Sequence, residues 1–492
     1  MIRIRPLIAL ALSLCGCTVG PDYVPPVVPA PPAWAESDGT RVDAVAVDTF
    51  WRRFADPTLQ DLLDRAVANN RDLRVAAARL RESQVRARAA GSALWPQVDV
   101  EATYSNSRLS EHGFLQGLAT GGTGGGAVFP GQQLDLHQIG FDASWELDLF
   151  GGGRRGLAAA EAVAGAAAYD LRAVLLSLCA RIADDYVELR SMQRRAALAE
   201  RLAATYRSAV AVLREQVQAG VADALELART ETELANREAD AAAYGGEITA
   251  VQRRIEAAVA SAPGGLASAL AAGDLPAVPD VLAIDVPAAT LRRRPDVGAA
   301  ERRLAAATAR IGVATAELYP RLSLTGAFGL QAQNLADLPR SDSRFWAVGP
   351  QVRWPLFDFG RVRAAIAIED TRAAQALATY EGVVVDALAD VEVALVRVAR
   401  WRRQVAALER ARDAARTAAR LADEQYRSGV REYLDVLEVQ AIADRSEDEL
   451  ARGDAALVHA VVALGKALGG GLRADAATVT SAVSDGRAST PP

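Results

Sequence analysis

The chain contains two related halves, and this repetition constrains its fold more than any other feature. Early in each half, equivalent residues lie 224 positions apart, as do Pro96 and Pro320. Further along, the separation falls to 209, as between Trp145 and Trp354. Each half repeats one plan over about two hundred residues, which is too long for a solenoid unit. The change of separation places a longer loop in the first half, between Pro96 and Gly140.

Residues 1–16 are typical of a secretory signal. Arg3 and Arg5 supply the positive charge, and residues 7–14 form an apolar stretch that is too short to span a bilayer. The sequence Leu14-Cys15-Gly16-Cys17 resembles a bacterial lipobox. It predicts that Cys17 begins the mature chain and carries a covalent lipid, whereas an ordinary cleaved signal is the alternative. Thr18 is not the aspartate of inner-membrane retention, so we expect an acyl-anchored protein of the outer membrane.

Composition excludes several other classes of protein. After removal of the signal only Cys17 and Cys179 remain, so no disulfide framework is expected, and Cys179 is interpreted as a small buried hydrophobe. The net charge of −6 and the lack of a basic cluster with aromatic residues argue against nucleic acid. No later stretch reaches eighteen consecutive apolar residues, which argues against a second membrane helix.

Long helices are predicted in both halves, because apolar residues recur every three or four positions through stretches without proline. The predicted helices span about 60–95, 153–218 and 223–261, then 288–318, 361–427 and 431–468. The longest would extend roughly 100 Å at ~1.5 Å per residue. Gly220 and Gly429 interrupt the pattern and predict turns between paired helices. Coiled-coil packing is the expected arrangement for helices of this length.

Between the helices the apolar period changes from 3.6 to 2. The predicted strands span about 97–107, 138–150, 321–331 and 346–358, each with one apolar and one polar face. This pattern is typical of transmembrane β-strands, although a soluble hairpin packed on a helix would show it too. The equivalent placement in both halves and the lipoprotein signal favour the membrane. Because common outer-membrane barrels need about eight strands or more, a chain with four must oligomerise to close one.

The predicted organisation follows from these patterns. The segments are a signal (1–16), a lipidated proline-rich segment (17–56), a first repeat (57–275), a second repeat (276–475) and a flexible tail (476–492).

Several motifs resemble those of the TolC-like outer-membrane efflux proteins, in particular the NodT-like lipoprotein branch that serves resistance-nodulation-division (RND) pumps. They are Cys17 with Gly20-Pro21-Asp22-Tyr23, Arg293-Arg294-Pro295-Asp296-Val297, Glu317-Leu318-Tyr319-Pro320, Tyr426-Arg427-Ser428-Gly429-Val430 and Tyr433-Leu434-Asp435-Val436-Leu437. The resemblance implies a mainly α fold with a membrane β-barrel. Four strands per chain would form a shared 12-stranded barrel in a homotrimer, and a coiled-coil tunnel would extend into the periplasm. It also implies a mixed α/β belt from the segment around 263–290 and both termini.

The resemblance further implies the partners and the site residues. The partners are a periplasmic adaptor, an inner-membrane RND-type pump and outer-membrane lipid. The implied site residues are the adaptor-contact turns (Gly220, Val221, Gly429, Val430), the periplasmic gate (Leu434, Asp435, Glu438) and the closed-state latch (Tyr426, Arg431, Glu226). Spacing alone places Asp435 and Glu438 on one helix face, where a solvated acidic face is the alternative interpretation. Ala224 replaces the small polar residue that is more usual at the first turn.

The function expected from the resemblance is that of a passive exit duct for drugs or other small molecules. The same fold serving type I protein secretion is the nearest alternative, and a non-channel periplasmic tether is a more distant one. An enzyme is the weakest candidate, since no catalytic arrangement is suggested. His112, His137 and His459 are scattered, so no metal site is predicted, and the glycine run 121–126 lacks the signature of a phosphate-binding loop.

Overall fold

The computed structural model describes residues 18–27, 30–36, 40–42, 49–108, 133–278 and 282–471. Cys17, His112, the glycine run 121–126 and the tail 476–492 lie outside the described residues, so the predictions for them stay predictions. The chain divides into two compact units. The sheet unit takes in Met1–Pro25, Glu82–Ala164 and Arg303–Leu377, and the helical unit takes in Pro26–Arg81, Gly165–Arg302 and Ala378–Pro492. Each unit draws on both sequence halves, so the compact units do not coincide with the repeats.

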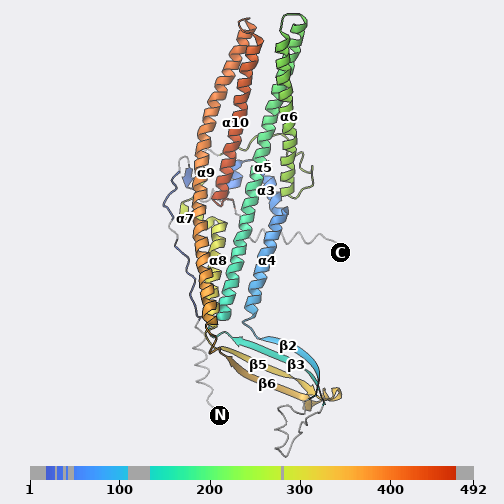
Figure 1. The fold of residues 1–492 in the computed structure, drawn as a ribbon, viewed down its shortest axis with the longest axis vertical. Helices are drawn as coiled ribbons and strands as arrows, with labels where there is room; N and C mark the ends of the chain where they lie inside the picture. Colours follow the sequence, from blue (N-terminus) through green and yellow to red (C-terminus); the bar gives the residue numbers. More distant parts are fainter. Residues whose placement is uncertain are drawn as a thin grey trace, which may run out of the picture. The chain divides into compact units, whose positions relative to one another are not determined.

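The sheet unit contains one antiparallel sheet of four strands (Figure 1). Its strands, in spatial order, are β2 (Gln97–Arg108), β3 (Gln133–Leu147), β5 (Arg321–Ala332) and β6 (Arg344–Arg353). The large apolar side chains of one face are exposed, among them Val100, Phe141, Phe328 and Trp346. The four predicted strands are therefore confirmed, with β2 and β6 as the edges of the sheet.

Two predicted strand ends were too long. We expected strands to continue to residues 150 and 358, but they end at Leu147 and Arg353. In both places an aspartate instead caps the following helix, α5 (Gly152–Gln218) or α9 (Arg361–Arg427). Asp148 accepts hydrogen bonds from the backbone N–H groups of Gly153 and Arg154 (3.0 and 2.8 Å), and Asp358 accepts them from Gly360 and Val362 (3.0 and 2.8 Å). These carboxylates satisfy donors that a helix start leaves unpaired.

The repeat is visible in contacts as well as in residues. The indole of Trp145 donates a hydrogen bond to the carbonyl of Leu94, at 3.0 Å. The indole of Trp354 donates to the carbonyl of Leu318, also at 3.0 Å. The tryptophans are 209 positions apart and the leucines 224. In each half the leucine precedes the point where the separation changes and the tryptophan follows it, so the two hydrogen bonds are equivalent.

The other helices are α3 (Pro57–Asn69), α4 (Arg71–Ser92), α6 (Ala224–Ala258), α7 (Pro287–Arg293), α8 (Pro295–Ala316) and α10 (Tyr433–Ala467). The predictions of single helices over 60–95 and 288–318 are wrong, because each is broken once. Asn70 has an extended backbone and caps α4 by accepting a hydrogen bond from the N–H of Leu73 (3.0 Å). At the second break, Pro295 disfavours the helical conformation for Arg294.

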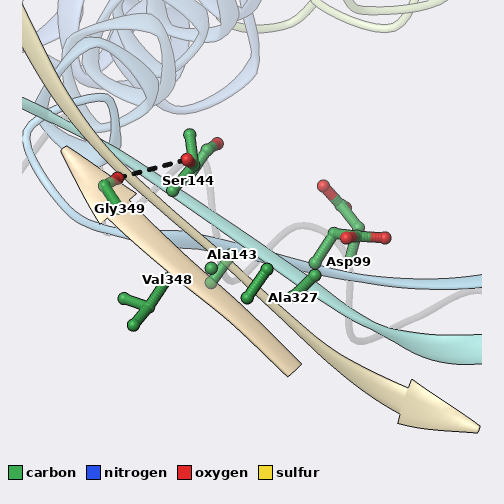
Figure 2. Close-up of a pocket in the computed structure, with 10 residues that line it drawn as sticks. Asp99, Ala143, Ser144, Ala327, Val348 and Gly349 are labelled. Carbon is green, nitrogen blue, oxygen red and sulfur yellow. Dashed lines mark hydrogen bonds between the residues drawn. The ribbon is translucent and has the colours of Figure 1, made fainter. Parts of the chain in front are cut away.

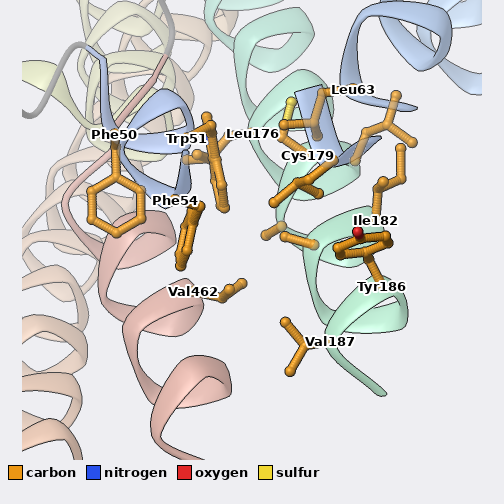
Figure 3. Packing of buried hydrophobic residues seen from close by; sticks show 14 of the residues in the cluster. Phe50, Trp51, Phe54, Leu63, Leu176, Cys179, Ile182, Tyr186, Val187 and Val462 are labelled. Atoms are coloured by element: carbon orange, nitrogen blue, oxygen red, sulfur yellow. The ribbon is translucent and has the colours of Figure 1, made fainter. Parts of the chain in front are cut away.

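The core lies in the helical unit. A short 3-10 helix, Phe50–Phe54, buries Phe50, Trp51 and Phe54. Figure 3 shows Trp51 and Phe54 between Leu176 of α5 and Val462 of α10. Cys179 is buried in the same cluster, as predicted. In the same unit β1 (Thr40–Val42) pairs in parallel with β4 (Leu282–Ile284), which supplies the β part of the expected mixed belt.

One helix of the described residues has the length and composition of a membrane span. By length and composition, α5 contains a stretch apolar enough to cross a membrane. Length and composition alone do not test the expectation that no second membrane helix follows the signal, so it stays a prediction. Apolar side chains of α5 such as Leu171, Leu175 and Ile182 are buried in the core cluster, so the composition of this helix has a packing explanation.

Candidate functional site

The two helical hairpins, α5–α6 and α9–α10, end in turns of the same design (Figure 1). Gly220 and Gly429 adopt left-handed conformations, with φ of 71° and 75°. The N–H of Val221 donates to the carbonyl of Gln216, and the N–H of Val430 donates to that of Gln425 (3.0 and 2.9 Å). Together with the glycine N–H bonds to the third preceding carbonyl, these form a Schellman cap, which requires a left-handed residue.

Each turn presents one valine to solvent. Val221 is 75% exposed and Val430 is 73% exposed. The turns differ at the start of the return helix, because Asp223 caps α6 through the N–H of Leu225 (3.0 Å), whereas Glu432 makes no side-chain cap for α10. The paired glycines and valines therefore form two equivalent exposed ends, as the sequence indicated.

The predicted gate residues lie in the first two turns of α10. Leu434 is half-buried, and Asp435 and Glu438 are exposed. The Asp435 carboxylate lies 3.8 Å from the guanidinium of Arg431, which precedes the helix. The two acids therefore face solvent from one side of the helix start.

The predicted latch residues make their contacts within the second hairpin. The Arg431 Nε donates to the side-chain oxygen of Gln425 (2.6 Å), and the rings of Tyr426 and Tyr433 lie 5.2 Å apart. Burial, followed by the nearby Tyr426 and Asp423, raises the pKa of Tyr433. Within the described part of the chain, no hydrogen bond or ion pair joins the Glu226 side chain to Tyr426 or Arg431. Tyr426 and Arg431 thus lie in the same hairpin, and each contacts a different neighbour, Tyr433 or Gln425.

A set of ion pairs that we did not predict joins the two hairpins along α5 and α10. It consists of the ion pairs Arg194–Asp454 (2.9 Å), Arg195–Asp448 (2.7 Å) and Arg201–Glu447 (3.1 Å), together with the hydrogen-bonded pair His459–Asp184 (2.9 Å). Glu447 also pairs with Arg416 of α9 (3.1 Å). Although burial opposes its ionisation, hydrogen bonds from Arg416 and Arg201 lower the pKa of Glu447. We call these four pairs the inter-hairpin ladder. With 24% charged residues in the chain, spacing could not single them out.

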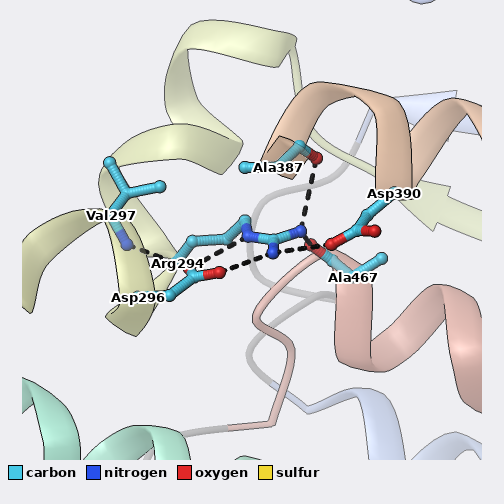
Figure 4. Close-up of polar contacts among 6 residues, drawn as sticks. All are labelled: Arg294, Asp296, Val297, Ala387, Asp390 and Ala467. Carbon is cyan, nitrogen blue, oxygen red and sulfur yellow. Dashed lines mark hydrogen bonds and ion pairs between the residues drawn. The ribbon is translucent and has the colours of Figure 1, made fainter. Parts of the chain in front are cut away.

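Arg294 is a second feature whose role the sequence did not reveal. Its buried guanidinium donates to both oxygens of Asp296 (3.1 and 2.6 Å) and to Asp390 (2.9 Å). It also donates to the backbone carbonyls of Ala387 and Ala467 (3.3 and 3.1 Å), as Figure 4 shows. Burial opposes ionisation of Asp296, but the Arg294 hydrogen bonds lower its pKa. One side chain thus joins the start of α8, the middle of α9 and the end of α10.

The sheet carries charged groups on the face opposite its exposed apolar one. Asp99 of β2 and Asp142 of β3 are direct register partners there. They line a cavity of about 490 Å³, floored by small residues such as Ala327 and Gly349. Figure 2 shows Asp99 and Val348 on opposite sides of the strands. Since like charges placed opposite each other destabilise a sheet, this pair is not explained by folding alone.

The described residues contain no group of three or more histidine, cysteine, aspartate or glutamate side chains suited to hold a metal ion. The two described histidines, His137 and His459, lie in different units. The Nδ1 of His459 lies 2.9 Å from Asp184 in the ladder, and the ring of His137 stacks on Tyr104.

Comparison with known proteins gives consistent matches along the chain. Residues 62–261 and 286–470 match the family model described as outer membrane efflux protein. The chain is 31% identical over 478 residues to the pyoverdine export outer membrane protein OpmQ of Pseudomonas putida, covering 96% of this chain and 98% of that protein. Its fold is similar to that of the outer-membrane channel OprN, with a TM-score of 0.83, 34% identity and coverage of 93% and 100%. It is also similar to the open state of the MtrE channel of Neisseria gonorrhoeae, with a TM-score of 0.79, 27% identity and coverage of 94% and 100%.

Proposed function

The chain belongs to the outer membrane efflux protein family, and we propose that three copies of it form a passive exit duct for small molecules. It is an outer-membrane channel component of an efflux system, and its fold is TolC-like. The family consists of channel proteins. The trimer, the partners and the transported class are the parts of this description that we propose.

One observation carries the proposal, namely a four-stranded sheet with an exposed apolar face and two edges. Contact with lipid would remove the exposed apolar side chains of this face from water. The edges β2 and β6 would still leave backbone N–H and C=O groups unpaired, and hydrocarbon does not tolerate such groups. Pairing β6 of one copy with β2 of the next removes every edge. Three copies give a closed barrel of twelve strands, which is within the range of outer-membrane barrels.

The helical hairpins would form the periplasmic part of the duct. Their glycine turns would contact a periplasmic adaptor, through Gly220, Val221, Gly429 and Val430. An inner-membrane RND-type pump would deliver the solute to the adaptor. Leu434, Asp435 and Glu438 would form the gate, and Tyr426 and Arg431, with Glu226 on the other hairpin, would hold it closed. The matched relative that is named for the export of pyoverdine, a small molecule, supports small-molecule efflux over protein secretion.

The covalent lipid on Cys17 is a further part of the proposal. The lipobox supports it, and the proline-rich segment after Cys17 gives the anchor a tether. The lipid would add membrane affinity of about 0.8 kcal/mol per buried methylene to an already embedded barrel. We propose no cofactor and no catalytic activity for this chain.

The test is to purify the protein in detergent and to measure its mass and its conductance in a planar bilayer. We expect a trimer that inserts and conducts ions without an energy source. A folded, stable monomer in detergent, or a trimer that inserts without conducting, would overturn the proposal.

A further inference from the structure

A cluster of arginines lies at the end of the sheet next to the helix starts. Arg321 begins β5, Arg353 ends β6, and the two are direct register partners. Together with Arg361, at the start of α9, they line a cavity of about 580 Å³. Its other charged or polar lining residues are Glu146, Glu317, Ser323 and Gln351. The cavity opens on the charged face of the sheet, because Arg321 and Ser323 alternate with the apolar Leu322 and Leu324.

The internal repeat shows that the fold does not require these arginines. The positions equivalent to Arg321 and Arg353 in the first half are Gln97 and Ser144, by the separations of 224 and 209. Gln97 and Ser144 are also direct register partners. The same strand pairing is thus made once with two neutral side chains and once with two cations. Since opposed like charges cost stability, the arginine pair calls for a reason other than folding.

The positive charge of this cavity is only partly neutralised, because three arginines line it with two glutamates, Glu146 and Glu317. The carboxylate of Glu317 lies 3.5 Å from Arg321 and 3.6 Å from Arg361, so one acid is shared between two guanidinium groups. Within the described part of the chain, the Arg353 side chain makes no hydrogen bond or ion pair. Guanidinium groups present planar pairs of donors that match the oxygens of carboxylates and phosphates.

The two opposed acids of β2 and β3, Asp99 and Asp142, are too far away to neutralise the arginines. Asp142 is the register partner of Ala327, six residues along β5 from Arg321. At ~3.4 Å per residue this is a separation of roughly 20 Å, more than twice the screening length of ~8 Å in physiological salt. The repeat equivalents of Asp99 and Asp142 are Ser323 and Gln351, which are neutral register partners. The strand pair β2–β3 therefore carries two opposed acids, and the strand pair β5–β6 carries two opposed arginines at a different position along the sheet.

We infer that the arginine cavity is a binding site for the anionic group, a carboxylate or a phosphate, of a solute passing through the duct. The inference rests on the proposed function, because it requires the charged face to line the lumen while the apolar face meets lipid. An anion bound between Arg321 and Arg353 relieves their repulsion and gains charge-assisted hydrogen bonds. The site would give the barrel end of the duct a preference for anions, whereas the acidic gate residues oppose anions.

The test uses the detergent-solubilised protein in a non-ionic detergent, with inorganic pyrophosphate as the probe. Calorimetry should detect binding to the wild type. The double variant R321Q/R353S installs the residues of the first half at the same strand positions, so its sheet should assemble normally. We expect its Kd for pyrophosphate to rise about tenfold. R353Q alone, which breaks no contact in the described structure, should raise it by a smaller factor.

The matched control is D99S/D142Q, which installs the residues of the second half at the acidic pair. It should bind pyrophosphate as the wild type does, or more tightly. Undiminished binding by R321Q/R353S, or an equal loss in the control, would overturn the inference. Competition by added phosphatidylglycerol would also overturn it, since it would assign the site to lipid headgroups. Conductance of the same wild-type preparation tests the duct separately, because a conducting protein that binds no pyrophosphate contradicts only the anion site.

Discussion

At the level of single residues, the two helix breaks are equivalent in position but differ in the number of hydrogen bonds that the residue at the break makes. Asn70 and Arg294 are equivalent positions of the repeat. Each side chain donates a hydrogen bond to the carbonyl of the last residue of the second helix in a helical hairpin, α6 for Asn70 and α10 for Arg294. Asn70 reaches Ala258 at 2.8 Å, and Arg294 reaches Ala467 at 3.1 Å. Arg294 additionally holds two aspartates and a second carbonyl. The helices of the second half are therefore joined by more hydrogen bonds at this point than those of the first half.

This difference predicts the cost of removing each side chain. Arg294→Gln should destabilise the protein by about 3 kcal/mol, because it leaves carboxylates and buried carbonyls without a donor. Asn70→Ala should cost about 1–2 kcal/mol, as loss of a cap and one hydrogen bond. The midpoints of thermal unfolding, followed by circular dichroism, should rank accordingly. Equal midpoints for the two variants would contradict this assignment.

The thiol of Cys179 gives a second residue-level prediction. Burial, with a smaller contribution from Asp64, raises the pKa of this thiol to about 12. Since only the thiolate reacts, maleimide should not label the folded protein at pH 8. After unfolding, one thiol per chain should react, because Cys17 is expected to be blocked by its lipid. Intact mass shows the number of labels, and a second labelled thiol would contradict lipidation.

Sequence reasoning identified the motif around Arg294 without finding what it does. The resemblance pointed to residues 293–297, and only the pairing with Asp296, two positions away, could have been suspected. Asp390 lies 96 positions further along the chain, and the contact depends on where α9 passes the start of α8. Asp22 is a similar case, since its partner Arg155 lies 2.7 Å away but 133 positions distant. Such pairs are set by packing, which local patterns do not encode.

At the level of elements, the ion pairs divide the first long hairpin into two regions. The inter-hairpin ladder ends, toward the turns, at Arg201 on α5 and Glu447 on α10. Nearer the first turn, ion pairs join α5 to its own partner α6, as in Arg207–Glu238 (2.6 Å) and Arg214–Glu231 (2.7 Å). The end of the first hairpin is thus tied internally, and the described residues contain no ion pair between the two hairpins on the turn side of Glu447. Separation of the ends should pivot at Glu447.

Weakening the ladder should therefore loosen the region beyond it. Ion pairs that remain partly open to solvent are worth about 0–1 kcal/mol each, so E447Q/D448N should lower the local opening free energy by about 1 kcal/mol. Amide exchange in the part of α10 nearest the turn should then rise about fivefold. The control E231Q removes a pair within the first hairpin and should leave exchange in α10 unchanged. Equal effects of both changes would rule out a pivot at the ladder.

The pH dependence of the ladder follows from Glu447. Its pKa is lowered in the folded state, so its pairs contribute stability that is complete above the ordinary glutamate pKa of ~4.3. That contribution is lost as the pH falls through the lower folded value. The exchange difference between wild type and E447Q/D448N should therefore be full at pH 6 and should shrink in acid below pH ~4.

Most elements could be predicted because their periodicity is strong. The prediction for α9, residues 361–427, matches its observed bounds, since apolar positions recur without proline throughout. The break at Asn70 was missed for a different reason. Asn70 is tolerated inside a helical pattern, and its capping bond to Leu73 competes with that pattern only once the chain turns. Strand ends were overestimated because alternation continues into residues 148–150, where a capping aspartate decides the backbone.

At the level of the whole molecule, the second half of the chain places charge of opposite sign at two different points of the proposed duct. The arginine cavity is in the sheet unit, whereas Asp435 and Glu438 lie beside the turn of the second hairpin. In a trimer each set would occur three times around one axis. Six carboxylates at a constriction favour cations and oppose anions, because like charges in a narrow ring attract a counter-ion from solution.

The gate prediction tests this arrangement directly. D435A/E438A should about halve the cation-over-anion permeability ratio, read from the reversal potential in a potassium chloride gradient. Block by multivalent cations should weaken in the same variant, since their binding depends on several carboxylates acting together. The matched control is D423N/E424Q, which removes two acids of α9 that are already paired with Arg427 and Arg420 (2.8 and 2.7 Å). The control should keep the wild-type ratio. A wild-type ratio in D435A/E438A as well would place the constriction elsewhere in the duct.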